Sequence, residues 1–125
     1  MAEAPQPTPR EMEILKVLWE IGPAGVRDVY RRLAEQQEED LAFNTVQTML
    51  RIMEEKGLVA HAVEGRAFIY RPLFTRENSL SRFVERVFDG AADQLVLTLL
   101  KTEKLSAKEL ERLQAQIESA RKQKR

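Results

Sequence analysis

The 125-residue chain contains no cysteine and only one histidine, His61. The absence of thiols excludes disulfide frameworks, thiol nucleophiles and cysteine-based metal sites, and one imidazole is too little for most metal or acid–base centres. The sequence also lacks a nucleophile elbow, a phosphate-binding loop and paired acid–base residues. These absences argue against an enzyme. They also predict that the protein binds no metal and no cofactor.

Long apolar runs are missing as well. No stretch of about 18 apolar residues occurs, so no membrane span is predicted. Residues 1–7 have neither the charged nor the apolar region of a secretory signal, and we expect them to be a disordered leader of a cytoplasmic protein. With 43% hydrophobic and 32% charged residues, the chain can form one small domain and a helical appendage.

The chain also has no excess of positive or negative charge, and its formal net charge is zero. The charges are unevenly spread, however. Residues 1–41 carry five basic and nine acidic side chains, residues 42–72 carry four and three, and residues 73–125 carry eleven and eight. Since nucleic-acid binding favours a basic surface, DNA contacts would have to come from a few placed residues.

Two helices are predicted before residue 38. Thr8-Pro9-Arg10-Glu11 has a capping threonine, a proline in the first turn and a glutamate that closes a capping box, and Gly22-Pro23 ends this helix. Apolar residues at helical spacing between 26 and 33 predict a second helix over residues 25–37. The acidic run 38–40 is interpreted as a solvated loop.

The third predicted helix, residues 43–56, carries the most specific pattern. Its apolar stripe is Val46, Met49, Leu50 and Met53. The opposite face presents the candidate DNA-binding residues Asn44, Thr45, Gln47, Thr48 and Arg51. Amide side chains can pair with adenine, arginine with guanine, and threonine can contact a base edge or a thymine methyl group. This face is therefore suited to a recognition helix in the major groove, and a merely solvated polar face is the alternative.

Two strand-like runs follow, over residues 58–63 and 67–71, and Glu64-Gly65-Arg66 between them predicts a hairpin. Three helices followed by a hairpin is the order of a winged helix-turn-helix domain. Arg66 at the tip is a candidate contact to backbone phosphate or to the minor groove. His61 is interpreted as a surface or cross-strand residue.

The second half contains three short apolar helices, one after Thr75, one over residues 91–100, and one opened by a capping box at Ser106–Glu109. They are too short to form a core alone, so we expect two copies to bury them together. The predicted dimerisation residues are Leu80, Phe83, Val84, Val87, Phe88, Leu95, Val96, Leu99, Leu110, Leu113 and Ile117.

The predicted fold class is mainly α with a small β-hairpin wing. A winged helix-turn-helix DNA-binding domain is expected over residues 8–73 and a helical dimerisation domain over residues 74–120. The basic tail, residues 121–125, is expected to be disordered.

Several runs together resemble the penicillinase-repressor (BlaI/MecI/CopY-type) family. EILKVLW at residues 13–19, followed by Gly22-Pro23 and by VRDV at 26–29, resembles the first half of these proteins. Their recognition helix is resembled by NTVQTML at 44–50 together with EEKGLV at 54–59. Their wing is resembled by GRAF at 65–68 together with YRP at 70–72.

The resemblance implies a homodimeric bacterial repressor of a palindromic operator. Genes regulated in the family include those for β-lactamases, penicillin-binding proteins and copper export. Thr45 and Thr48 match the recognition threonines of the family, and Arg66 matches a wing position. Ile52 stands where some members have arginine, which implies a shifted operator preference.

In the antibiotic-linked branch, a membrane sensor metallopeptidase triggers cleavage within the C-terminal arm. The matching stretch here is 96–99, where Thr98-Leu99 replaces the Asn-Phe bond of the best-known members. These two residues are the candidate site of proteolytic release, and the inducing signal stays open. The copper-sensing branch has C-terminal cysteines that this chain lacks, so copper sensing is not expected.

We therefore predict a sequence-specific repressor that binds double-stranded DNA as a homodimer. The alternative is a winged-helix module that binds a protein partner. Zero net charge and the acidic first helix favour the alternative, whereas the lack of a large exposed apolar stripe on the third helix opposes it.

Overall fold

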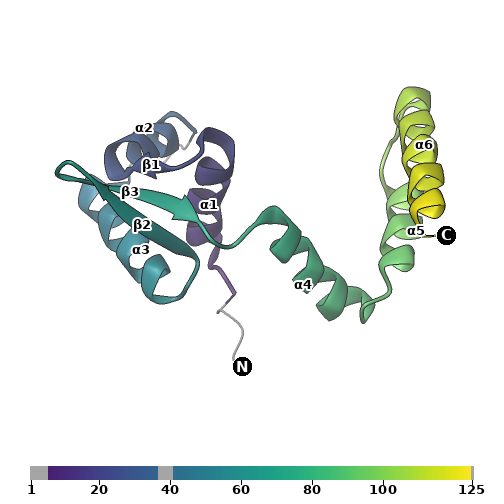
Figure 1. Ribbon diagram of the computed structural model, residues 1–125, viewed down its shortest axis with the longest axis horizontal. Helices are drawn as coiled ribbons and strands as arrows, with labels where there is room; N and C mark the ends of the chain where they lie inside the picture. The colour runs from purple at the N-terminus through teal and green to yellow at the C-terminus, as the bar shows by residue number, and fades with distance from the viewer. Residues whose placement is uncertain (1–5, 37–40, 125) are drawn as a thin grey trace. The chain divides into compact units, whose positions relative to one another are not determined.

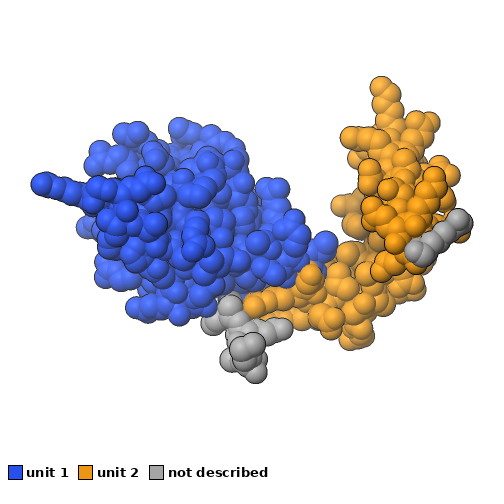
Figure 2. Space-filling view, in the orientation of Figure 1, with its two compact units in different colours: residues 1–80 blue, residues 81–125 orange. Residues whose placement is uncertain are grey.

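The computed structural model describes residues 6–36 and 41–124 and divides the chain after Leu80 (Figure 2). The first unit, residues 1–80, contains α1 (Pro9–Ile21), β1 (Ala24–Gly25), α2 (Val26–Gln36), α3 (Phe43–Glu55), β2 (Val59–Glu64) and β3 (Ala67–Pro72) (Figure 1). The second unit, residues 81–125, contains α5 (Ala92–Thr102) and α6 (Ala107–Gln123). Helix α4 (Arg76–Phe88) begins in the first unit and ends in the second. The predicted acidic loop at 38–40 lies outside the described residues.

The predicted start of α1 is confirmed in detail. The Thr8 hydroxyl accepts a hydrogen bond from the Glu11 backbone at 3.1 Å, and the Glu11 carboxylate accepts one from the Thr8 backbone at 2.9 Å. Pro9 occupies the first turn, and Gly22 ends the helix with φ of 83°. Pro7, which was predicted to be part of a disordered leader, is buried, while residues 1–5 lie outside the described part of the chain.

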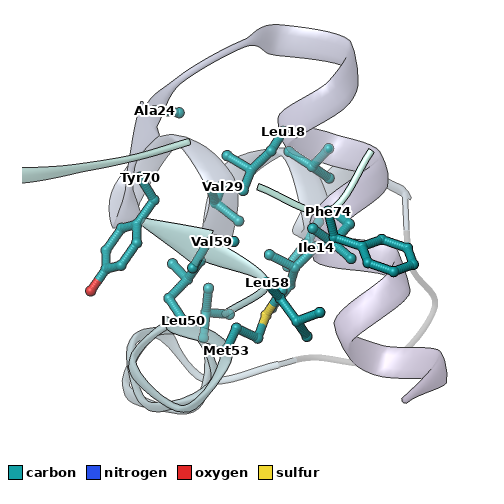
Figure 3. Close-up of a cluster of buried hydrophobic side chains, with 14 residues drawn as sticks. Ile14, Leu18, Ala24, Val29, Leu50, Met53, Leu58, Val59, Tyr70 and Phe74 are labelled. Carbon is teal, nitrogen blue, oxygen red and sulfur yellow. The ribbon is translucent and has the colours of Figure 1, made fainter. Parts of the chain in front are cut away.

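The core of the first unit comes from one face of each helix and from the base of the hairpin. Ile14 and Leu18 from α1, Val29 from α2 and Leu50 from α3 are all almost fully buried (Figure 3). The remaining members of this cluster are Leu15, Val17, Ala24, Leu33, Val46, Met53, Leu58, Val59, Tyr70 and Phe74. The apolar stripe predicted for α3 is thus the side that packs inward, and it turns the polar face outward.

The hairpin belongs to a three-stranded antiparallel sheet in the order β1-β3-β2. Gly65 takes φ of 61° in the predicted turn, and this turn projects beyond the helices (Figure 1). Strand β1 was missed by the sequence analysis, which placed Gly25 in the second helix. Its two residues pair with Tyr70 and Ile69 and tie the start of α2 to the wing.

The segment after β3 is held against α1. The indole Nε1 of Trp19 donates a 2.9 Å hydrogen bond to the Phe74 carbonyl, although 55 positions separate the two residues. The guanidinium carbon of Arg76, in the first turn of α4, lies 5.6 Å from the centre of the Trp19 ring. Trp19 thereby attaches the beginning of α4 to the first unit.

The helices of the second unit have no buried residue among those described. Asp89 and Gly90 end α4 with φ values of 51° and 82°, and the Gly90 N–H donates a hydrogen bond to the Val84 carbonyl. The capping box predicted for α6 is confirmed, with Ser106 and Glu109 each accepting from the other's backbone.

The basic tail differs from the prediction. Residues 121–123, expected to be disordered, continue α6, which ends at Gln123. Arg121 pairs with Glu118 at 3.1 Å, and basic side chains in a last turn are favoured by the partial negative charge of the helix end. In the described part of the chain, no helix combines the length and the apolar character needed to cross a bilayer.

Candidate nucleic-acid interface

Helix α3 presents its predicted DNA-binding residues to solvent. Asn44, Thr45, Gln47, Thr48 and Arg51 are all exposed. They share this position because Val46, Leu50 and Met53 occupy the opposite side of the helix and are fully buried. The packing of α3 therefore leaves a neutral and basic polar face with no acidic side chain before the last turn.

The side of α3 near Arg51 faces the hairpin. Burial raises the pKa of Tyr70 on β3, the nearby Glu54 carboxylate raises it further, and the Arg51 guanidinium lowers it. Arg51 and Glu54 of α3 therefore both lie close enough to Tyr70 to act on its hydroxyl. Arg51 therefore belongs to the polar face of α3 and also acts on Tyr70 of the wing.

A hydrogen-bonded pair joins α3 to β2. The Nδ1 atom of His61 lies 2.6 Å from Oε2 of Glu54, and the His61 backbone N–H donates to the same oxygen at 3.1 Å. The imidazole also stacks on Phe68 of β3, with ring centres 4.2 Å apart. His61 is thus a cross-strand residue, as predicted, but its link to Glu54 was missed because seven positions and a strand boundary separate the two residues.

The wing carries Arg66 at its tip. Arg66 is exposed in the turn after Gly65, and the paired residues Val63 and Phe68 beside it are 59% and 48% exposed. Arg51 acts on Tyr70 of β3, whereas Arg66 lies in the turn at the tip of the hairpin. The two arginines can therefore contact different parts of one extended ligand.

The other end of α3 is flanked by basic residues that the sequence analysis did not single out. A shallow hollow near Phe43 is lined by Arg27, Tyr30 and Arg31 of α2, and the rings of Tyr30 and Phe43 meet edge to face at 5.7 Å. Arg27 and Arg31 are exposed and lie one helical turn apart. Their spacing of four residues was the available signal, because it places both on one side of α2.

A partly buried ion pair anchors the C-terminal end of α3. The Nζ atom of Lys56 lies 2.8 Å and 3.1 Å from the two carboxylate oxygens of Glu11, whose side chain is almost fully enclosed. Burial by itself raises the pKa of Glu11, but hydrogen bonds from Lys56 and Thr8 and the charge of Lys56 outweigh it and lower the pKa. The helix that carries the polar face is thereby tied to the cap of α1.

The predicted dimerisation residues lie on α4, α5 and α6, and most of them are at least two-fifths exposed. This group contains Leu80, Phe83, Val87, Val96, Leu99, Leu110, Leu113 and Ile117. Val84, Phe88 and Leu95 are half-buried. An apolar groove between α5 and α6 is lined by Val96, Leu99, Leu100, Leu105 and Leu113.

The candidate cleavage site lies inside a regular helix. Thr98 and Leu99 are exposed residues of α5, and the Thr98 hydroxyl donates to the Gln94 carbonyl at 2.7 Å. The backbone at this bond is therefore helical, so a peptidase could reach an extended form of it only after α5 opens locally.

A comparison with known families matches residues 7–119 to the penicillinase repressor model. The chain belongs to the penicillinase repressor family. The penicillinase repressor of Bacillus licheniformis is 28% identical, over all of this chain and 99% of the relative. The methicillin resistance regulatory protein MecI of Staphylococcus aureus (strain N315) is 23% identical, over 82% of this chain and 85% of the relative. The resemblance stated from the sequence is therefore confirmed.

Solved structures support the same fold. The DNA-binding domain of the repressor BlaI is 31% identical with a TM-score of 0.53, covering 62% of this chain and 93% of that domain. The monomeric form of Bacillus licheniformis BlaI, solved in complex with the blaP half-operator, is also 31% identical, with a TM-score of 0.51 and the same coverage. The predicted fold class, mainly helical with a small winged-helix sheet, is confirmed by these likenesses.

Membership of this family assigns the chain to the DNA-binding winged-helix transcriptional repressors. That class consists of regulators and not of enzymes, in agreement with the predicted lack of catalytic machinery. The individual DNA contacts, the dimerisation residues and the cleavage site stay predictions.

Proposed function

We propose that this penicillinase-repressor family member blocks transcription as a homodimer on a palindromic operator. Each copy would insert α3 into a major groove and lay its wing along the adjacent backbone. The observation that carries the proposal is the composition of the exposed side of α3. Side chains that can read bases occupy its first turns, and the acidic residues Glu54 and Glu55 are confined to its last turn.

This distribution of charge orients the helix. Recognition helices contact base edges mainly through their N-terminal residues, and carboxylates near phosphates are repelled. A docking with Asn44 deepest in the groove keeps Glu55 farthest from the DNA. Glu54 is compatible with the same docking because its carboxylate is engaged by His61.

Backbone contacts would come from both sides of α3. Arg66 on the wing would contact phosphate or the minor groove on one side. Arg27 and Arg31, beside the start of α3, would contact phosphates on the other. Since the chain has no net charge, these placed arginines supply the attraction that its overall composition does not.

The homodimer is supported by the apolar side chains that the second unit leaves exposed. Phe83, Val87 and Leu113 are 46%, 57% and 43% exposed, and no helix of this unit has a buried residue among those described. Burial of one such side chain is worth about 1.5–3 kcal/mol. A second copy of the same helices offers the complementary surface, and two-fold symmetry then matches a palindrome with half-sites one or more DNA turns apart.

The proposal extends to regulated genes and to release. Genes of β-lactam resistance are the targets that family membership favours. Cleavage at Thr98-Leu99 by a membrane sensor metallopeptidase would separate α6 from the rest of the arm and weaken the dimer, after local opening of α5. A repressor that loses one half-site contact loses most of its affinity for the operator.

The test begins with selection of bound duplexes from fragments upstream of the gene and from a random pool, using the full chain. The selected duplex is then titrated by anisotropy at about 0.15 M salt beside a scrambled one. We expect a Kd of roughly 10⁻⁸–10⁻¹¹ M, at least about a thousandfold below that for the scrambled duplex. Equal and weak binding to both would overturn the proposal and favour a protein-binding module.

A further inference from the structure

One large apolar side chain interrupts the polar face of α3. Ile52 is 41% exposed, whereas the inward residues Val46, Leu50 and Met53 are fully buried. Ile52 therefore adds little to the core of the first unit. Between Asn44 and Ile52, the other exposed residues of α3 are amides, hydroxyls and one arginine, so Ile52 adds an apolar contact to a surface that is otherwise suited to hydrogen bonds.

Helical spacing places Ile52 in line with the two threonines. Thr45, Thr48 and Ile52 are three and four residues apart and form one ridge along the exposed side. Gln47 and Arg51 lie on the flank toward the hairpin. The exposed side of α3 thus has a flank suited to hydrogen bonds and a ridge in which every side chain carries a methyl group.

The major groove contains one apolar group that varies with sequence, the C5-methyl group of thymine. Resting on the function proposed above, we infer that Ile52 packs against a thymine methyl group in each half-site, and that the methyl groups of Thr45 and Thr48 extend this contact. The operator would then require thymine, and not merely a pyrimidine that pairs with adenine, at the base facing Ile52.

The expected size of the effect follows from the hydrophobic contribution of one carbon. Burial of one methylene-sized group changes a binding constant about fourfold. Replacement of the contacted thymine by deoxyuridine removes only this methyl group and leaves base pairing and the hydrogen-bonding edge intact. Made in both half-sites of a palindrome, the replacement should weaken binding about fifteenfold.

The experiment uses the full chain and the duplex obtained by selection, with deoxyuridine placed symmetrically at each thymine position in turn. In the wild-type protein, one position should show a loss of about tenfold or more. In the Ile52→Ala variant, deoxyuridine at that position should no longer lower the affinity. The effect of deoxyuridine at every other position should stay as in the wild type. Thr48→Ser, which removes a methyl group and keeps the hydroxyl, should reduce the loss of affinity at that same position without removing it.

Ile21 supplies the matched control, because it is 42% exposed and lies on α1 and not on the proposed recognition helix α3. Ile21→Ala should leave every deoxyuridine penalty as in the wild type. A penalty that survives in Ile52→Ala, or a selected half-site without a methyl-sensitive thymine, would overturn the inference while the repressor function stands. A wild-type protein that does not distinguish the selected from the scrambled duplex would overturn the proposed function itself.

Discussion

His61 on the wing and Glu54 on α3 are joined by two hydrogen bonds. One runs from the imidazole Nδ1 to the carboxylate at 2.6 Å, and the other from the His61 backbone N–H at 3.1 Å. Because a carboxylate accepts hydrogen bonds, the Nδ1 atom of His61 is the donor to Glu54. Phe68 stacks on the face of the same ring, so His61 connects the wing to the helix that we propose to read the operator.

Replacement of Glu54 by alanine should therefore loosen the wing. We expect operator affinity to fall several-fold and the free energy of unfolding of the first unit to fall by about 1 kcal/mol, since two hydrogen bonds are lost. Anisotropy titration and urea unfolding measure the two quantities. Glu55→Ala is the control, because it removes one negative charge from the same turn. Equal effects of the two substitutions would show that the link to His61 has no such role.

The Glu11–Lys56 pair leads to a prediction about stability. Glu11→Ala should destabilise the first unit by about 1–3 kcal/mol, because it removes a capping box and leaves the Lys56 ammonium without its partner. Glu11→Gln should cost less, because glutamine can still close the capping box. Urea unfolding followed by Trp19 fluorescence checks the order. Glu13→Gln, in an exposed pair with Arg10, should change stability by less than about 0.5 kcal/mol.

The same pair predicts a dependence on pH. Hydrogen bonds from Lys56 and Thr8 overcome the effect of burial and hold the pKa of Glu11 below its ordinary value of 4.5. A lowered pKa means that the stabilisation is present above pH 4.5 and is lost as the pH falls through the lower, folded-state pKa. The stability difference between wild type and Glu11→Gln should be constant from pH 7 to pH 5 and shrink at pH 4 and 3. A difference that grows on acidification would contradict this assignment.

The sequence predicted the elements that are defined by local signals. Capping boxes at Thr8 and Ser106, the apolar stripe of α3 and the turn at Gly65 all depend on residues within a few positions of each other. Each is therefore visible in a short window of sequence. Since the polar face of α3 is the complement of its buried stripe, its exposure could be predicted as well.

The features that escaped prediction depend on contacts between distant segments. Strand β1 has only two residues, too few for any periodicity, and exists because β3 offers it an edge. Lys56 reaches Glu11 across 45 positions, and Trp19 reaches Phe74 across 55. No spacing rule connects such residues, because the packing of the helices alone decides which side chains meet.

Arg66 and Arg51 should differ in their effect on DNA binding. Arg66→Ala should weaken binding to all duplexes alike, because a wing contact to phosphate carries no sequence information. If the dimer neutralises about six phosphates, a plot of log affinity against log salt concentration should have a slope near −5. Loss of the two Arg66 contacts, one from each copy, should bring this slope to about −3.

Arg51→Ala, like Thr48→Ala, should instead reduce the ratio of the affinity for the operator to that for the scrambled duplex. An unchanged salt slope in Arg66→Ala would place the wing away from the backbone.

The apolar arm yields the last prediction. Leu113 is 43% exposed beside the groove between α5 and α6, so a lysine there would put two charges into the proposed dimer interface. Leu113→Lys should weaken dimerisation at least about a hundredfold, since burial of one leucine from each copy is worth about 3–6 kcal/mol in total. Sedimentation equilibrium measures this change. The neighbouring Gln114→Lys adds the same charge on another side of α6 and should leave the dimer intact.

The two variants also separate assembly from folding. Trp19 lies in the first unit, where it bonds to Phe74, so its fluorescence should be the same in both variants and in the wild type. At nanomolar concentration Leu113→Lys should then lose affinity for the full operator while its weak affinity for a single half-site is unchanged, because we expect each first unit to read DNA alone. A Leu113→Lys protein that stays dimeric would show that two copies associate through a surface other than α5 and α6.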